Sequence, residues 1–461
     1  MADTTTIWAE GALLADGWRP AVRLTVDGAG VIAAVEAGVA PRRDDVTLGG
    51  QRLLPAPVNV HSHAFQRAMA GMTEVRTGPD DDFWTWRQLM YAFLEHLDPD
   101  HIRAIAAMAQ LEMLEAGFAA CGEFHYLHHG PGGQPYADLA AMAGSIVEAA
   151  KLTGIGLTLL PVLYCRGGVD NSPLTAGQRR FGNDLEGFAK LLEASEARLA
   201  ELPGDSRLGL APHSLRAVAM ADIEAAVALR PQGPIHIHVA EQMAEVAAIV
   251  GDSGLRPVMR LCNDIAVDER WCLIHATHMV PAETRAVARS GCVVGLCPLT
   301  EANLGDGVFD APRHREAKGR IAVGSDSNIS ISLADELRTL EYAQRLNRRR
   351  RVVYCDENAS VGRTLLGACA AGGAQAAGRD AGALAPGKLA DVLSLDLTHP
   401  SFAGLDGDAL LDTWIFAAPG GCVRHVWSAG RWVVKDGRHG RRDEIAAGFR
   451  TAMADLRRRG L

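Results

Sequence analysis

Short apolar runs recur along most of the chain, and segments with helical periodicity separate them. Eight of these runs have the length and apolar content of buried strands. They are residues 58–63, 121–128, 156–165, 207–214, 233–241, 271–278, 291–298 and 320–327. One intervening segment has Asp98 as its predicted N-cap, Pro99 at the first helical position and Gly117 as its stop. Strands that alternate with helices in this way predict a (β/α)8 barrel, the TIM-like fold.

The two ends of the chain have a different pattern, with short strand-like runs and frequent turn signals. Residues 1–55 show this pattern, and residues 385–436 repeat it. We therefore expect a small β-sandwich that is built from both chain ends and interrupted by the barrel. The predicted parts are residues 1–56 for the first part of the sandwich, 57–384 for the barrel, and 385–461 for the second part with a C-terminal helix.

Composition and charge narrow the function classes. The chain has 461 residues, of which 48% are hydrophobic and 22% charged, as in ordinary globular proteins. Its formal net charge of −9 argues against nucleic acid or an anionic membrane as a partner. The N-terminus lacks the pattern of a signal peptide, and no apolar run is long enough for a transmembrane helix. The nine cysteines show no C-x-x-C pair, which favours reduced thiols and a cytoplasmic location.

Polar side chains fall at the carboxyl ends of the predicted strands, where barrel enzymes place their active sites. His61 and His63 are two residues apart, so both face the same side of the first strand. His238 ends the fifth strand and Asp326 ends the eighth. Three histidines and one aspartate suit a single Zn²⁺ with room for a water, although Fe²⁺ and Mn²⁺ accept the same ligands. Bound zinc lowers the pKa of such a water to about 7.

Two features of the metal site stay undecided: the choice between His236 and His238 as a ligand, and the number of metal ions. His236 shares the face of His238, and we favour His238 only because it lies nearer the strand end. Glu123 is able to bridge a second metal in principle. However, the third and fourth strands contain no lysine that could serve as the usual bridging ligand of two-metal barrel hydrolases. One metal per chain is therefore the simpler interpretation.

Two further residues have the position and chemistry of acid-base groups. Glu241 lies three residues beyond His238, where a carboxylate reaches a substrate atom without binding the metal. The alternative is a solvent-facing glutamate at a helix N-terminus. His275 closes the sixth strand and is placed to polarise the substrate or hold the attacking water, whereas His278 is interpreted as structural.

These residues resemble the amidohydrolase superfamily over nearly the whole chain. The motifs H-x-H, H-x-x-E and GSDSN are similar to those of its mononuclear deaminase branch, and PGKLADVLSLD is similar to its small flanking sandwich. Longer stretches, among them NVHSHAFQRAMAGMTE, DDFWTWRQLMY and GSDSNISISLADELRTLEY, resemble the formimidoylglutamate deiminases. Those enzymes hydrolyse N-formimidoyl-L-glutamate to N-formyl-L-glutamate and ammonia in histidine degradation, and similar proteins are commonly homodimers.

The resemblance implies a role for each matching position. The four ligand-type residues would hold zinc, and Asp326 would also take a proton from the metal-bound water. Glu241 would pass a proton to the nitrogen that leaves as ammonia, and His275 would assist. A small dicarboxylate substrate calls for arginines and hydrogen-bond donors. The candidates in matching motifs are Gln66, Arg87, Tyr126, His213 and Arg216.

Some candidates near the predicted site have competing interpretations. Arg67 and Arg338 are weaker substrate-binding candidates, and Arg87 has the acidic residues 80–82 as alternative ion-pair partners. The segment 64–97 is long enough to cover the site.

Two alternative functions stay open at this point. A mononuclear zinc aminohydrolase acting on a purine or pyrimidine ring would share the same metal ligands. It would need aromatic walls, for which Phe83, Trp84, Trp86 and Tyr126 are available in a chain that is only 5% aromatic. A barrel that has lost its metal and serves in protein assembly is the non-enzymatic alternative, and the intact ligand and acid-base set argues against it.

Overall fold

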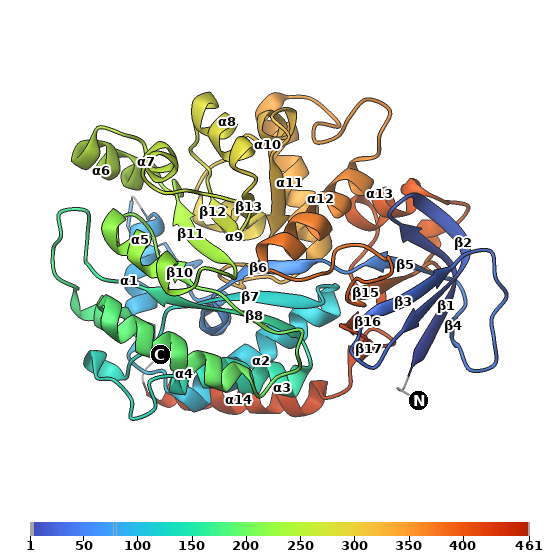
Figure 1. Ribbon diagram of the computed structural model, residues 1–461, viewed down its shortest axis with the longest axis horizontal. Coiled ribbons are helices and arrows are strands. Elements are labelled where there is room, and N and C mark those ends of the chain that lie inside the picture. Colours follow the sequence, from blue (N-terminus) through green and yellow to red (C-terminus); the bar gives the residue numbers. More distant parts are fainter. Residues whose placement is uncertain (1–3, 77, 80, 460–461) are drawn as a thin grey trace.

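A closed barrel of parallel strands is the centre of the molecule in the computed structural model, which describes residues 4–76, 78–79 and 81–459 (Figure 1). Each of the eight predicted runs contains a strand, and the fourth contains two short ones. The strands are β6 (Val58–Ser62), β7 (Ala120–His125), β8 (Gly156–Leu163), β9 (Arg207–Leu208), β10 (Ala211–Pro212), β11 (Ile235–Val239), β12 (Trp271–His275), β13 (Val293–Leu296) and β14 (Arg320–Val323). The barrel prediction is confirmed.

The barrel consists of two hydrogen-bonded arcs that meet at two seams. One arc has the order β10-β8-β7-β6, with β9 beside β8, and the other has the order β11-β12-β13-β14. Isolated parallel bridges close the seams, one between Ser62 and Asp326 and two between the β10 region and β11. Apolar side chains such as Val60, Ile274 and Val293 fill the interior below the strand ends. Polar residues are therefore accommodated mainly at the carboxyl ends of the strands.

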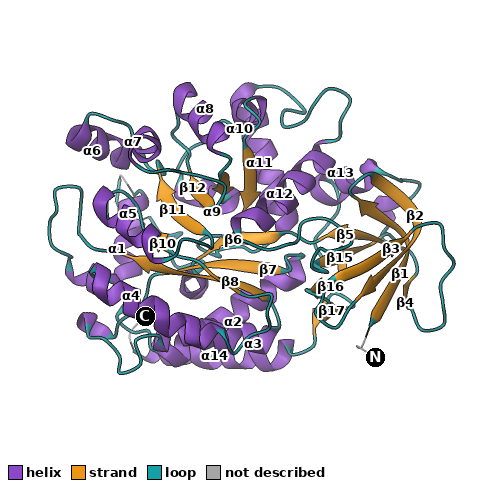
Figure 2. Cartoon of the chain, viewed as in Figure 1, coloured by secondary structure: helices purple, strands orange, loops and turns teal. Residues whose placement is uncertain are grey.

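Helices surround the barrel (Figure 2). Those that follow barrel strands are α1 (Phe83–Leu94), α2 (Pro99–Ala116), α3 (Ala141–Thr153), α4 (Leu185–Leu199), α5 (Met220–Leu229), α6 (Met243–Ser253), α7 (Pro257–Asp264), α8 (Pro281–Ser290), α9 (Pro298–Leu304), α10 (Ala311–Glu316), α11 (Leu333–Arg348) and α12 (Val361–Ala376). Helix α2 has the predicted ends. Asp98 caps it through the backbone N–H of His101, and Gly117 ends it with a φ of 104°.

The chain ends build one mixed sheet beside the barrel, on the right of Figure 1. Its strands among the described residues are β1 (Thr5–Leu14), β2 (Gly17–Val26), β3 (Ile32–Glu36), β4 (Val46–Leu48), β5 (Gln51–Pro55), β15 (Val392–Asp396), β16 (Val423–Ser428), β17 (Arg431–Lys435) and β18 (Arg438–His439). Strand β5 pairs antiparallel with β15, and this pairing joins the N-terminal strands to the C-terminal ones. A β-unit from both chain ends is therefore present, as the sequence predicts.

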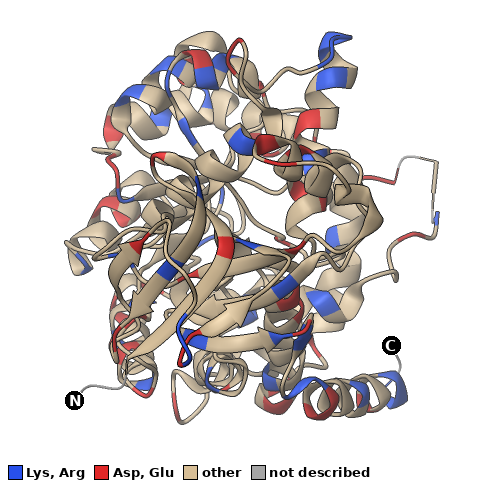
Figure 3. Cartoon of the chain, turned by 90° about the vertical axis from the view of Figure 1, so that its right-hand side faces the viewer, with Lys and Arg blue, Asp and Glu red and all other residues tan. Residues whose placement is uncertain are grey.

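The last two helices connect this unit to the barrel. Helix α13 (Asp408–Phe416) packs on α11 and α12, and α14 (Arg442–Arg458) packs along α2. Glu115 of α2 accepts a hydrogen bond from the backbone N–H of His439 at 2.8 Å and forms an ion pair with Arg442. Acidic and basic residues are interspersed over the elements seen in Figure 3. No helix within the described part of the chain is long and apolar enough to cross a membrane.

Candidate active site

The seam between β6 and β14 brings the first and eighth strand ends together. The backbone N–H of Asp326 donates to the carbonyl oxygen of His61, and that of His63 donates to the carbonyl oxygen of Asp326, both at 2.9 Å. This close approach requires a glycine at position 324, because a Cβ there would lie 2.6 Å from the backbone nitrogen of His61. The sequence GSD therefore places the Asp326 carboxylate directly beside the two histidines.

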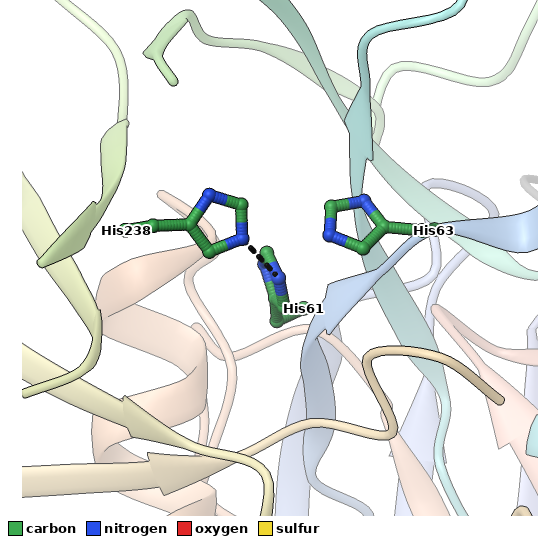
Figure 4. A group of neighbouring side chains, drawn as sticks. All are labelled: His61, His63 and His238. Carbon is green, nitrogen blue, oxygen red and sulfur yellow. Dashed lines mark hydrogen bonds between the residues drawn. The ribbon is translucent and has the colours of Figure 1, made fainter. Parts of the chain in front are cut away.

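His61, His63 and His238 point toward one another from opposite arcs of the barrel (Figure 4). Their ligand-type nitrogens lie within 4.8 Å of one another, and the Nε2 atoms of His61 and His238 are 3.0 Å apart. Asp326 Oδ1 lies 3.5 Å from His61 Nε2 and 3.3 Å from His63 Nε2. His61, His63 and His238 thus form one cluster of ligand-type nitrogens, with Asp326 next to His61 and His63, and a second cluster consists of His61, His275 and Asp326.

Hydrogen bonds behind two of these rings fix their orientation. His63 Nδ1 donates to the carbonyl oxygen of Phe124 at 2.9 Å, and His238 Nδ1 donates to that of His213 at 3.1 Å. A ring that donates through Nδ1 leaves the Nε2 lone pair for a metal. Burial lowers the pKa of all three histidines, that of His61 to about 3, so the rings are neutral. This donor set fits one Zn²⁺.

Asp326 is held as a carboxylate. Burial alone raises its pKa, but the hydrogen bond with His61 and the attraction of His275 act in the opposite direction, and the pKa lies below its usual range. Asp326 Oδ2 lies 3.9 Å from His275 Nε2. One oxygen of this carboxylate therefore faces the ligand histidines, and the other faces His275.

Glu241 and His275 form an acid-base pair next to the ligands. Their Oε1 and Nε2 atoms are 3.8 Å apart, and both side chains are buried. Burial raises the pKa of Glu241. Burial lowers the pKa of His275, but Glu241, Glu301 and Asp326 outweigh it and raise that pKa to about 10. The Nε2 atom of His275 therefore faces the Glu241 and Asp326 carboxylates of the site.

Glu301, on α9, is the residue that sequence reasoning missed. Its Oε1 accepts from His275 Nδ1 at 3.2 Å and also from the backbone N–H of Cys297 at 2.9 Å. Glu245 has a comparable role on α6, where it accepts from the backbone N–H groups of Ala240 and Glu241. No spacing along the chain links Glu301 to His275, since His275 lies at the end of a different strand, whereas Glu245 binds the backbone of the turn directly before its own helix.

The backbone is strained at three of the strand ends. Ala240, His275 and Asp326 have φ values of 52°, 67° and 45°, in the left-handed region that non-glycine residues rarely adopt. Such residues cost about 1–3 kcal/mol each and cluster at functional sites. Here the strained conformation turns the chain at the end of the strand and aims Glu241, His275 and Asp326 at one another.

His236 and Glu123, the two undecided metal-ligand candidates, are not part of the ligand clusters. His236 Nε2 forms a hydrogen bond with the carbonyl oxygen of Ala376 at 2.8 Å, at the other end of the barrel interior. Glu123 accepts from the backbone N–H of Ala64 at 2.8 Å, and burial raises its pKa to about 8. His278 Nε2 binds the carbonyl oxygen of Asp306, which fits the structural interpretation.

A narrow cavity above the ligand set contains all five predicted substrate-binding residues. Its lining includes His63, His238, Glu241, His275 and Asp326 at the base and Gln66, Arg87, Tyr126, His213 and Arg216 on the walls. Gln66 donates to the Tyr126 hydroxyl at 2.9 Å, and the Gln66 Oε1 atom is buried without a hydrogen-bond partner. Arg87 donates to the Tyr164 hydroxyl at 2.9 Å. Neither Arg87 nor Arg216 has a carboxylate partner among the described residues.

Helix α1 lies within the segment 64–97 and covers one side of this cavity. Phe83, Trp86 and Met90 line it beside Arg87. Asp82 caps α1 through the backbone N–H groups of residues 84 and 85, and Asp80 lies outside the described residues. Arg67 instead pairs with Glu112 through two hydrogen bonds, and Arg338 binds Asp335 and the Ile415 carbonyl oxygen. These two arginines are not part of the cavity.

Comparisons with known proteins agree with this geometry. The model of the amidohydrolase family matches residues 52–433, and that of the N-terminal domain of formimidoylglutamate deiminase HutF matches residues 4–47. The formimidoylglutamate deiminase of Pseudomonas aeruginosa is 48% identical over 98% of this chain and 99% of its own length. The chain belongs to the formimidoylglutamate deiminases of the amidohydrolase family.

Other proteins are also similar over most of their length. A crystal structure of an amidohydrolase from Brucella melitensis superimposes with a TM-score of 0.93 and 46% identity, covering 98% of this chain and 99% of that one. A 5-methylthioadenosine/S-adenosylhomocysteine deaminase of Natronomonas pharaonis is 28% identical over 90% of each chain. The chain is therefore a hydrolase of the amidohydrolase family, and its 48% identity to the formimidoylglutamate deiminase is much higher than its 28% identity to the Natronomonas pharaonis deaminase.

Proposed function

We propose that this protein hydrolyses N-formimidoyl-L-glutamate to N-formyl-L-glutamate and ammonia. The observation that carries the proposal is one cavity with a metal-ligand set at its base and two arginines without carboxylate partners on its walls. The base suits hydrolysis of a carbon–nitrogen bond, and the walls suit a dianion. The similarity to the Pseudomonas aeruginosa enzyme supports the same substrate.

The chain's own residues supply the proton transfers. A divalent cation held by His61, His63, His238 and Asp326 supplies, when bound, a water acidic enough to ionise near neutral pH. Asp326 takes a proton from the attacking water as a bond forms to the formimidoyl carbon. Glu241 delivers one proton to the terminal nitrogen as the water oxygen adds, and the proton taken up by Asp326 follows it to the same nitrogen. The new hydroxyl group then returns its proton to Glu241 as the carbonyl forms, so that the carbon–nitrogen bond breaks and ammonia leaves. The Nε2–H of His275 stabilises the developing negative charge.

The wall residues hold the glutamate half of the substrate. Arg87 and Arg216 bind carboxylate through charge-assisted hydrogen bonds, for which the planar guanidinium is suited. Tyr126 and His213 offer further polar contacts, and the unpartnered Gln66 Oε1 accepts from a donor of the substrate. Binding both carboxylates leaves the formimidoyl group at the base of the cavity, next to Glu241.

Ammonia release separates this proposal from the ring-deaminase alternative. The purified enzyme, loaded with Zn²⁺, is assayed against N-formimidoyl-L-glutamate and a panel of purines and pyrimidines. We expect release from formimidoylglutamate with a kcat/KM of at least about 10⁴ M⁻¹s⁻¹, the low end for natural substrates. A purine or pyrimidine that is preferred over formimidoylglutamate would instead establish the alternative.

Removing either arginine tests the carboxylate clamp. For Arg87→Met and Arg216→Met we expect a higher KM and a loss in kcat/KM worth about 2–4 kcal/mol, because a bound carboxylate is left without its cation. Arg67→Met is the matched control, since its ion pair with Glu112 lies outside the cavity. Wild-type kinetics in both cavity variants would rule out the clamp.

The resemblance also bears on the location, assembly and pathway of the enzyme. We propose that the enzyme is a cytoplasmic homodimer that acts in histidine degradation. Light scattering on the purified protein measures the assembly, and growth on histidine as nitrogen source after gene deletion tests the pathway. Monomers at micromolar concentration would contradict the homodimer. Unimpaired growth of the deletion strain would contradict the role in histidine degradation.

A further inference from the structure

We propose that Trp84 is a positioning residue that holds both Arg87 and Arg216 in place for a dicarboxylate substrate. The inference rests on the proposed function and names the residue that gives the cavity its preference for dianions. The indole ring is in contact with both guanidinium groups. The Arg87 Cζ atom lies 5.7 Å from the ring centroid, and the Arg216 Cζ atom lies 5.6 Å from it. Both distances are in the range of attractive cation–π interactions.

The two arginines need such a partner. Neither forms an ion pair with a carboxylate among the described residues, and two cations on one cavity wall repel each other. Arg87 has a hydrogen bond to Tyr164 and a second ring contact, with Tyr91 at 5.3 Å. Arg216 has less support, because its Nε atom is buried without a hydrogen-bond partner. Trp84 is thus the aromatic ring that both arginines share.

Trp84 itself is held firmly. It lies in the first turn of α1, where the Asp82 side chain accepts its backbone N–H at 2.8 Å. Its ring meets that of Phe83 edge to face, with the centroids 5.2 Å apart. Phe83 is buried and lines the substrate cavity. The helix cap and the Phe83 contact therefore fix the ring relative to the cavity.

Holding the arginines in advance favours binding of the dianion. A long side chain loses rotamer freedom when it binds a ligand, and a clamp that is already ordered avoids that loss. The same ring also bears on the alternative function, because a face in contact with guanidinium groups is not available to stack on a purine or pyrimidine. Trp84 is thus expected to contribute to substrate preference and not to the proton transfers.

The test compares a dicarboxylate with a substrate that lacks carboxylates. Trp84→Leu and Trp84→Phe are assayed on N-formimidoyl-L-glutamate and on N-propylformamidine, and glutarate binding is measured by calorimetry. For Trp84→Leu we expect KM for formimidoylglutamate and Kd for glutarate to rise about 5- to 30-fold. We expect kcat, and hydrolysis of N-propylformamidine, to stay within about twofold. Trp84→Phe restores part of the loss, because phenylalanine keeps a smaller aromatic face.

The control is Gln88→Leu, at an exposed position of the same helix. Unchanged KM and glutarate affinity in Trp84→Leu would overturn the inference. An equal loss on both substrates would also overturn it, since the ring would then only support α1. Glutarate binding distinguishes the two proposals. A wild-type enzyme inactive on formimidoylglutamate refutes the proposed function, whereas Trp84-dependent glutarate binding in that enzyme would still support the positioning role.

Discussion

Glu241→Gln is expected to lower kcat by about 10²- to 10⁴-fold, while the protein stays folded and keeps its metal. Glutamine preserves the size of the side chain but carries no proton to the departing nitrogen. Glu241 is buried beside His275 on the lining of the substrate cavity, and burial raises its pKa. Steady-state ammonia release measures kcat, circular dichroism measures the folded state, and metal analysis measures the metal content.

A matched substitution shows whether the loss is specific to this position. Glu224 is exposed on α5, and Glu224→Gln removes the same charge away from the cavity, so its kinetics should be those of the wild type. Loss of the metal in Glu241→Gln would assign Glu241 to the ligand set. Wild-type turnover in that variant would remove it from the proton path.

Asp326→Asn is expected to have the other large effect, because one carboxylate serves both the metal and the proton transfer. Asparagine keeps an oxygen but has little basicity and no charge. We expect kcat to fall by at least about 10³-fold, combining a lost general base with a weakened metal site. Metal content after dialysis against a weak chelator should fall below that of the wild type. Near-normal turnover in this variant would exclude Asp326 as the base.

The same measurements count the metal ions. The wild type should hold about one per chain, as expected for one set of three histidines and an aspartate. Glu123→Gln is the informative companion, because Glu123 is the buried carboxylate that a second metal would use. We expect it to leave the metal content unchanged. Two tightly bound metals in the wild type, one of them lost in Glu123→Gln, would contradict the mononuclear site.

Much of the fold follows from local sequence signals. Helix α2 begins after Asp98 and ends at Gly117, because an acidic cap, a proline at the first position and a glycine stop each act within one turn. The strand-end positions of His61, His63 and His238 follow from period-two alternation and from apolar runs that stop at polar residues. The domain boundaries after residues 56 and 384 stay predictions.

What the sequence leaves undetermined depends on contacts between distant segments. Alternation assigns His236 and His238 to one face, and their contacts separate their roles: His236 bonds to Ala376 on α12, whereas His238 lies beside His61. Glu301 reaches His275 from helix α9, which follows a different strand, and no local pattern encodes that contact. Arg87 and Arg67 both follow the first strand. Arg87 faces the cavity and Arg67 pairs with Glu112, because helix packing determines which side of the chain faces inward.

The left-handed backbone at the strand ends limits how this enzyme can be made more thermostable. Glycine is the usual remedy for a positive φ, since it adopts that conformation without steric cost. At His275 and Asp326, substitution by glycine would delete side chains that we propose for the chemistry. At Ala240 it would delete only a methyl group. A search for heat-resistant variants should therefore concentrate on the outer helices and the terminal sheet, and treat the strand ends as a region where stability and turnover oppose each other.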